Sequence, residues 1–154
     1  MKTPHRSNRP PLAGKRILVT HAKAFMAPVL CEVLVEQGAE VILSNDALLD
    51  PDAPAALVAA TGHIDILIAN LALAAPTTPA DKVADTEWRD MFAALVDPLP
   101  RLVRAVLPQM MARRAGKILV MGSASALRGM KRASTYSAAR GAQLAYAQAV
   151  GVEV

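Results

Sequence analysis

The chain has 154 residues and a mass of 16.2 kDa, the size of a single domain. Apolar residues make up 53% and charged residues 19%, which excludes a disordered composition and allows a buried core. Aromatic residues make up only 3%, too few for a protein that stacks rings on single-stranded nucleic acid. The one cysteine, Cys31, excludes an internal disulfide and is typical of a reducing compartment, so we expect a cytoplasmic protein.

The net charge of +4 comes from the N-terminus. Residues 1–16 hold five of the 17 basic residues and no acidic one, which leaves 12 basic against 13 acidic residues in the rest of the chain. We predict a flexible basic arm over residues 1–14, a partial Rossmann-like domain over 15–154, and no nucleic-acid partner. The longest uncharged run, 66–80, has 15 residues and contains two prolines, so no membrane span is expected.

Apolar runs alternate with helical patterns along the chain. In order, the pattern predicts a strand at 16–20, a helix at 28–37, a strand at 40–44, a short helix ending at Gly62, a strand at 64–70, a long helix at 86–114, a strand at 117–121 and a helix at 134–150. Pro98 and Pro100 must kink or interrupt the long helix. Continuous apolar strands separated by helices indicate an α/β fold, a Rossmann-like doubly wound parallel sheet, whose ligands bind at the carboxyl ends of the strands.

The first predicted turn between a strand and a helix, 20–27, contains no glycine. A dinucleotide site needs glycines there, because the backbone must approach the pyrophosphate closely. The ring of Phe25 is expected where a phosphate or a nicotinamide would lie. We therefore expect no cofactor bound in the usual way. Asp46, after the second strand, is interpreted as a cap or turn residue rather than a ribose ligand.

The last predicted strand and helix carry the best candidate for catalysis. Ser123 follows the strand, and Tyr136 and Arg140 are one helical turn apart, which puts them on one face of the helix. A phenol is a poor base at neutral pH, but a nearby guanidinium favours the phenolate, and a serine can hydrogen-bond a substrate oxygen. The competing interpretation is a half-buried tyrosine, a surface arginine and a serine that only caps a turn.

These residues resemble the short-chain dehydrogenase/reductase superfamily. The resemblance runs from about Lys15 to the C-terminus. It rests on the apolar strand ending in Asn70, on Trp88, on Leu107–Met110, on Gly116–Ala124, and on the twelve residues between Ser123 and Tyr136.

Three departures occur together and are similar to the halohydrin dehalogenases, a cofactor-free branch of the superfamily. The reductases have lysine where this chain has Arg140, and an asparagine where it has Leu95. Side chains also replace the glycines of the first turn, at His21, Phe25 and Ala27. The dehalogenase branch has the Ser–Tyr–Arg spacing, and its first turn matches Thr20 and Phe25 but not Ala27.

The resemblance implies a haloalcohol substrate. Ser123 and Tyr136 would bind the hydroxyl group, and Tyr136, assisted by Arg140, would remove its proton. The alkoxide would then expel halide to form an epoxide, and small anions would open epoxides in the reverse direction. Thr20 and Phe25 would line the halide pocket, no cofactor would be needed, and the partners would be haloalcohols, epoxides and small anions.

The resemblance also implies missing parts. Residues 44–64 leave no room for an expected strand–helix pair, and the chain ends at Val154, before two strands that the family has. We therefore expect a C-terminally truncated fold with an open edge strand. Such a chain is predicted to be poorly soluble or a homo-oligomer, and a weak catalyst.

Two alternatives remain open. One is a nicotinamide-dependent reductase that binds NAD(P) despite Phe25. The other is a non-catalytic remnant that has kept only the scaffold. No metal site is predicted, because His5, His21 and His63 lack paired ligand spacing and Cys31 has no partner.

Overall fold

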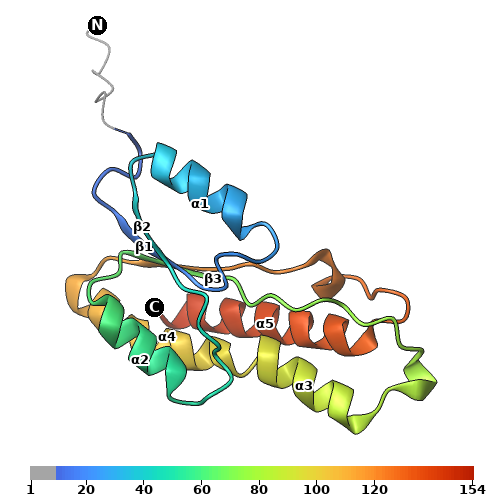
Figure 1. Ribbon diagram of the computed structural model, residues 1–154. Helices are drawn as coiled ribbons and strands as arrows, with labels where there is room; N and C mark the ends of the chain where they lie inside the picture. The colour runs from blue at the N-terminus through green and yellow to red at the C-terminus, as the bar shows by residue number, and fades with distance from the viewer. Residues whose placement is uncertain (1–9) are drawn as a thin grey trace, which may run out of the picture.

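The computed structural model describes residues 10–154, so residues 1–9 of the predicted arm lie outside the described part. Four strands form one parallel sheet in the order β2-β1-β3-β4 (Figure 1). They are β1 (Arg16–Val19), β2 (Glu40–Leu43), β3 (Ile66–Ala69) and β4 (Lys117–Val120). The chain moves from β1 to β2 on one side and then returns to β3 on the other. The carboxyl ends of β1 and β3 therefore flank the position where such sheets bind ligands.

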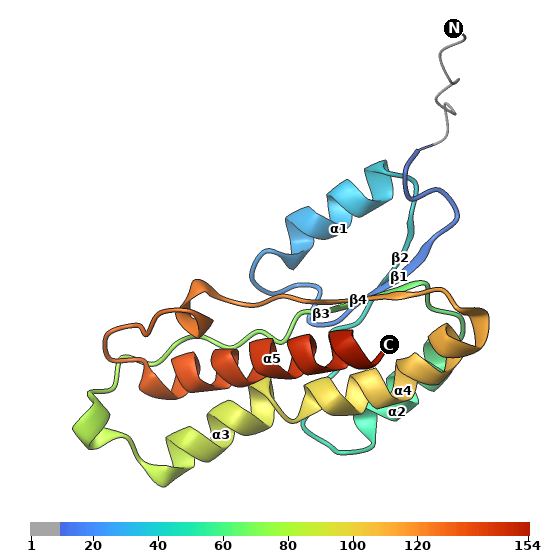
Figure 2. The same cartoon turned by 180° about the vertical axis from the view of Figure 1, so that it is seen from behind.

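Helices cover both faces of this sheet. Helix α1 (Ala27–Glu36) lies on one face, and α2 (Ala53–Thr61), α3 (Asp85–Leu95), α4 (Pro98–Arg113) and α5 (Ser134–Glu153) lie on the other (Figures 1 and 2). Two short 3₁₀ turns, η1 (Ala80–Lys82) and η2 (Ala124–Ala126), lie in the loops. Each face of the sheet buries its own apolar cluster. The predicted Rossmann-like α/β fold with a parallel sheet is confirmed.

The long helix is interrupted as predicted. It ends at Leu95 and begins again at Pro98, whose nitrogen has no proton to donate. The amides of Val96 and Asp97 both donate to the Phe92 carbonyl, and the Leu99 amide donates to the Val96 carbonyl. The Leu95 carbonyl is thus left free to accept a bond from another element.

Residues 10–14 form a turn at the edge of the domain. The Leu12 amide donates to the Gln37 carbonyl at 3.0 Å, just past the end of α1, and Leu12 packs against the cluster under that helix. The part of the predicted arm that the structure describes is therefore in contact with the domain.

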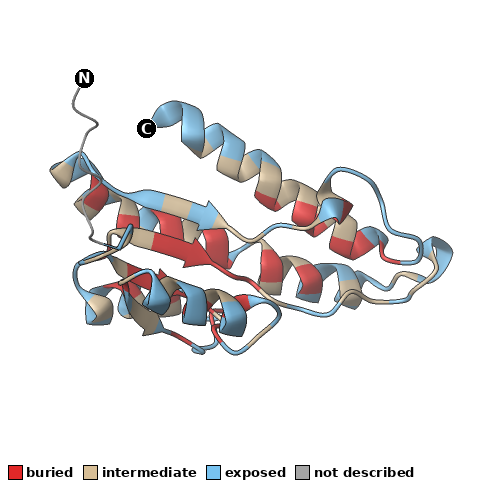
Figure 3. Cartoon of the chain, turned by 90° about the horizontal axis from the view of Figure 1, so that it is seen from above, coloured by how far each residue is buried: buried red, intermediate tan, exposed pale blue. Residues whose placement is uncertain are grey.

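The burial of the strands is uneven. In β3, three of four residues are buried, whereas β4 alternates exposed and half-buried positions (Figure 3). In addition, Leu119 of β4 is 46% exposed. The reason is that β3 is flanked by strands on both sides, whereas β4 is the last strand of the sheet. Over residues 10–154, no helix has both the length and the apolar character that a membrane crossing requires.

Candidate active site at the carboxyl ends of the strands

The first turn is held by side chains from two strands. The Thr20 side chain is fully buried, and its hydroxyl donates to the Asn70 carbonyl at 3.0 Å. In return the side-chain amide nitrogen of Asn70, Nδ2, donates to the carbonyls of His21 and Ala24, at 3.0 and 3.1 Å. Thr20, predicted to line a halide pocket, is placed where it fixes the turn from inside. The clamp made by Asn70 was not predicted from the sequence.

Two residues of this turn adopt a backbone conformation that favours glycine. His21 has φ 43° and Phe25 has φ 58°, both in the left-handed region. These are positions at which the resemblance to the reductases led us to expect glycines. The turn therefore keeps a glycine-like backbone path but carries side chains along it. Such positions are strained for a bulky residue and need support from the surrounding structure, which the Asn70 clamp provides.

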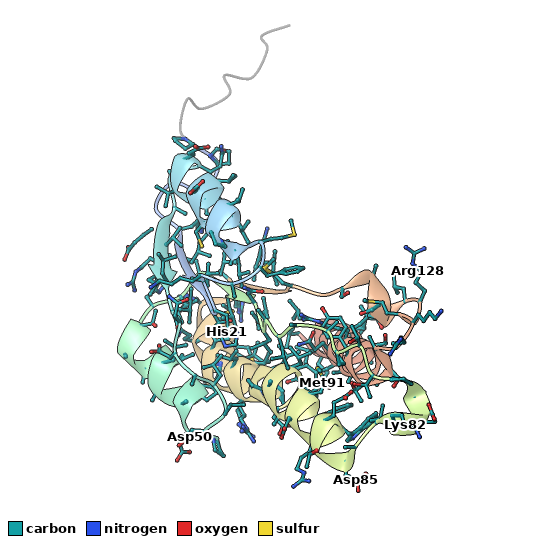
Figure 4. All side chains as sticks on the ribbon, turned by 45° about the vertical axis from the view of Figure 1, so that its right-hand side comes forward. His21, Asp50, Lys82, Asp85, Met91 and Arg128 are labelled. Carbon is teal, nitrogen blue, oxygen red and sulfur yellow. The ribbon has the colours of Figure 1, made fainter. Side chains whose placement is uncertain are left out.

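The side chains of this turn point in different directions. Phe25 is 70% exposed, close to the N-terminus of α1. His21 instead lies toward the interior, whereas the labelled Asp50, Lys82 and Arg128 lie at the periphery (Figure 4). The Ala72 amide donates to His21 Nδ1 at 3.1 Å, and burial lowers the pKa of His21. The imidazole is therefore neutral at pH 7, with its proton on Nε2.

This turn lacks the glycines that let a backbone approach a dinucleotide closely. None of its residues from Thr20 to Ala27 is glycine, so Cβ atoms stand along the whole path. The acid that could bind a ribose, Asp46, instead accepts a hydrogen bond from the Ser44 hydroxyl at 2.8 Å. The end of β2 is joined to the turn by Asn45, whose side chain accepts from the Lys23 amide. The polar groups at this edge are thus engaged with one another.

Tyr136 and Arg140 lie together on the buried face of α5. Tyr136 is 6% exposed and Arg140 is 4% exposed. The Cζ atom of Arg140 lies 5.0 Å from the centre of the Tyr136 ring, which is a cation–π contact. The predicted spacing therefore does bring the two residues together, and Arg140 is not the surface arginine of the competing interpretation. The cation faces the ring, where it adds positive potential beside the phenol.

Arg140 is fixed by two acceptors. Its Nη1 donates to the Met121 carbonyl at 3.0 Å, and to Gln143 Oε1 at 2.9 Å. Its Nε is buried, and no partner for it occurs within residues 10–154. Because Met121 follows β4, the first bond joins α5 to the end of the sheet. The buried charge therefore depends on these contacts to offset the loss of hydration.

Gln143 completes this network and was missed in the sequence. It is 1% exposed, and its amide nitrogen donates to the Leu95 carbonyl, which the helix break leaves free. The available signal was its position, three residues after Arg140 and seven after Tyr136, on the same helical face. A glutamine is rarely buried to this extent.

Ser123 lies at the start of η2, which packs against α5. It is half-buried, and its hydroxyl oxygen accepts from the Ser125 amide at 3.2 Å and from the Ser125 hydroxyl at 2.9 Å. Within the described chain, no hydrogen bond joins Ser123 to Tyr136. The structure therefore brings the Ser123 segment to the helix that carries Tyr136, with the Ser123 proton free to donate to a further acceptor.

A groove of about 520 Å³ lies away from these residues, between α4, β4 and the C-terminal half of α5. Its walls are mostly apolar and include Val103, Ile118 and Tyr146, but none of Ser123, Tyr136 and Arg140. The groove is therefore separate from the candidate site. Over the described residues, no group of three or more His, Cys, Asp and Glu residues could hold a metal.

Comparison with known proteins identifies the family. Residues 51–154, more than half of the chain, match the short chain dehydrogenases. The chain belongs to this family, in agreement with its Rossmann-like α/β fold.

Two related enzymes with different named activities are similar to this chain in sequence. The chain is 29% identical to the 3-oxoacyl-(acyl-carrier-protein) reductase FabG of Vibrio harveyi, over 93% of this chain and 68% of that protein. It is also 29% identical to 2-keto-3-deoxy-L-fuconate dehydrogenase of Xanthomonas campestris, covering 92% of this chain and 54% of that protein.

Among solved structures, a protein described as a dehalogenation enzyme superposes with a TM-score of 0.77 at 28% identity, over 84% of this chain and 62% of that one. Serine dehydrogenase from Escherichia coli superposes with a TM-score of 0.81 at 22% identity, which shows the shared fold alone. The chain thus spans about two thirds of the FabG reductase and less of the dehalogenation enzyme.

Proposed function

We propose that this chain carries the site of a halohydrin dehalogenase-like lyase, which converts vicinal haloalcohols to epoxides and halide without a cofactor. The observation that carries the proposal is the buried Arg140 guanidinium against the Tyr136 ring, at the position where the family's reductases have lysine. The turn without glycine and the similarity to a dehalogenation enzyme support it.

The proposed reaction begins with the substrate hydroxyl between Ser123 and Tyr136. The Ser123 proton, which no described acceptor takes, donates to the substrate oxygen. Tyr136 acts as the base that accepts the hydroxyl proton, with the positive charge of Arg140 5.0 Å from the centre of its ring. The oxygen then attacks the neighbouring carbon, a C–O bond forms as the C–halogen bond breaks, and halide leaves with the bonding electron pair.

The leaving halide is proposed to lie at the first turn. Phe25 is exposed there, beside the N-terminus of α1, whose partial positive charge favours an anion. The fully buried Thr20 supports this turn through its bond to Asn70. The reverse reaction would open an epoxide with a small anion held at the same place.

Halide release from bromoethanol and from a larger phenyl-substituted bromohydrin tests the proposal. Tyr136→Phe removes the base, so we expect release to fall by about 100-fold or more. Tyr146→Phe is the matched control, since Tyr146 lies on the same helix and lines the separate groove. We expect Tyr146→Phe to keep the activity of the unmodified chain. Equal release by both variants, or none by the folded parent chain, would contradict the proposal.

A reductase is the second candidate function, and the named FabG and fuconate relatives favour it. Tyr136 would then exchange a proton with a carbonyl substrate, and a nicotinamide dinucleotide would have to bind over the Phe25 turn. A fluorescence titration with NADH and NADPH separates the two candidates. Saturable binding that strengthens in Phe25→Gly would support the reductase, whereas no binding by either protein would support the lyase.

A further inference from the structure

We propose that Gln143 is a positioning residue, which holds the Arg140 guanidinium against Tyr136 by tying it to the break between α3 and α4. The proposal rests on the proposed function of this site. Gln143 does not touch Tyr136 in any hydrogen bond of the described residues, so it acts through Arg140.

The orientation of the Gln143 amide is dictated by its two partners. The Leu95 carbonyl can only accept, so it must face the amide nitrogen. Arg140 Nη1 can only donate, so it must face the amide oxygen. One side chain therefore joins a free helix carbonyl to a buried cation in a single arrangement. A buried amide with either end unpaired would be strongly destabilising, which makes this arrangement specific.

The bridge restricts how Arg140 can move. Nη1 carries two protons, and both are used, one on the Met121 carbonyl of the β4 end and one on Gln143. Two acceptors on different elements fix the plane of the guanidinium, with Tyr136 against it. Without Gln143, Arg140 Nη1 would keep only the Met121 carbonyl as acceptor, and the guanidinium could rotate about that one hydrogen bond.

The chemistry of the amide also matters. A carboxylate at this place could accept the same bond, but its negative charge would offset the cation that Tyr136 needs. A neutral amide holds the guanidinium and leaves its charge uncompensated. The two acceptors that bind Arg140, the Met121 carbonyl and the Gln143 side-chain amide, are both neutral, so neither offsets its charge. The proposal therefore predicts different effects on the mobility of Arg140 and on kcat when Gln143 is replaced by an apolar residue and by an acidic residue of similar size.

The test compares Gln143→Met and Gln143→Glu with the matched control Gln148→Met, an exposed glutamine on the same helix. The first readout is the side-chain Nε–H signal of Arg140 in a ¹⁵N-labelled chain, assigned by its absence in Arg140→Lys. The second is the rate of halide release from bromoethanol, per folded molecule, separated into kcat and KM.

In Gln143→Met we expect faster solvent exchange of the Arg140 Nε–H, by about tenfold or more, and a kcat at least about tenfold lower with KM little changed. In Gln143→Glu we expect the bond from Arg140 to remain and the bond to the Leu95 carbonyl to be lost, because a carboxylate has no proton to donate. The exchange of the Arg140 Nε–H should therefore rise less than in Gln143→Met, while kcat still falls because the charge of Arg140 is offset. Gln148→Met should change neither. Unchanged exchange in Gln143→Met would overturn the proposal, as would full kcat in both variants. Because exchange is measured without substrate, it decides the matter even where the parent chain releases no halide.

Discussion

At the residue scale, the first turn shows how a site can be changed while its backbone path is kept. His21 and Phe25 occupy left-handed conformations that glycine adopts freely, and Asn70 holds the turn from β3. The absence of glycine was plain in the sequence. That the backbone keeps the glycine-like path could not be predicted, because it depends on bonds from a residue about fifty positions away.

His21 makes the stability of the chain depend on pH. Burial lowers its pKa in the folded state below the ordinary value of 6.5, so as the pH falls toward that value the unfolded chain binds a proton more readily than the folded one. The free energy of unfolding should therefore fall as the pH falls through 6.5. His21→Asn, which suits a left-handed backbone, should flatten this dependence in urea titrations at several pH values. The comparison is with the unmodified chain, because His63 lies 3.1 Å from Asp65 and is not a neutral control. An unchanged slope in His21→Asn would contradict the prediction.

At the scale of elements, the break between α3 and α4 links the fold to the site. The sequence shows that Pro98 interrupts the long helix. It does not show that this interruption frees the Leu95 carbonyl, which then accepts from Gln143. The partner of that carbonyl lies 48 residues further along the chain, on α5. Local propensity predicts where a helix ends, whereas packing decides which group satisfies the end.

Gly116, between α4 and β4, tests how tightly these two elements pack. A Cβ added there would lie 2.4 Å from Met110 Cγ and 2.7 Å from Met110 Cβ. Gly116→Ala should therefore lower the free energy of unfolding by about 1–3 kcal/mol, through overpacking. Gly129→Ala is the control, since a Cβ there meets nothing within 4 Å, and a change below about 0.5 kcal/mol is expected.

Urea or thermal unfolding of the two variants checks this. Equal stability of Gly116→Ala and Gly129→Ala would show that Met110 moves aside without strain.

At the scale of the whole molecule, no strand of residues 10–154 pairs with the outer edge of either end strand of the sheet. The outer strands are β2 and β4, and β4 borders the apolar groove formed with α4 and α5. An exposed edge presents unpaired amides and carbonyls, which favours pairing with another chain. The predicted homo-oligomer is therefore kept as a proposal, with a second copy of this chain paired along β4.

Light scattering of the purified chain tests that proposal. We expect the unmodified chain to be larger than a monomer, and Leu119→Lys, on the exposed side of β4, to shift it toward the monomer. Leu127→Lys is the control, because Leu127 is 82% exposed in a loop and should leave the size unchanged. A sharp monomer peak for the unmodified chain, with cooperative melting, would contradict the proposal.

Apolar periodicity and spacing along one helix were enough to predict the order of strands and helices, the parallel sheet and the facing of Tyr136 and Arg140. Only the tertiary structure decided which groups meet across long separations: Asn70 on the first turn, Met121 and Gln143 on Arg140, and Leu95 on Gln143. The physical reason is that a buried polar group must find a partner wherever the packed elements place one, and no local pattern records that place.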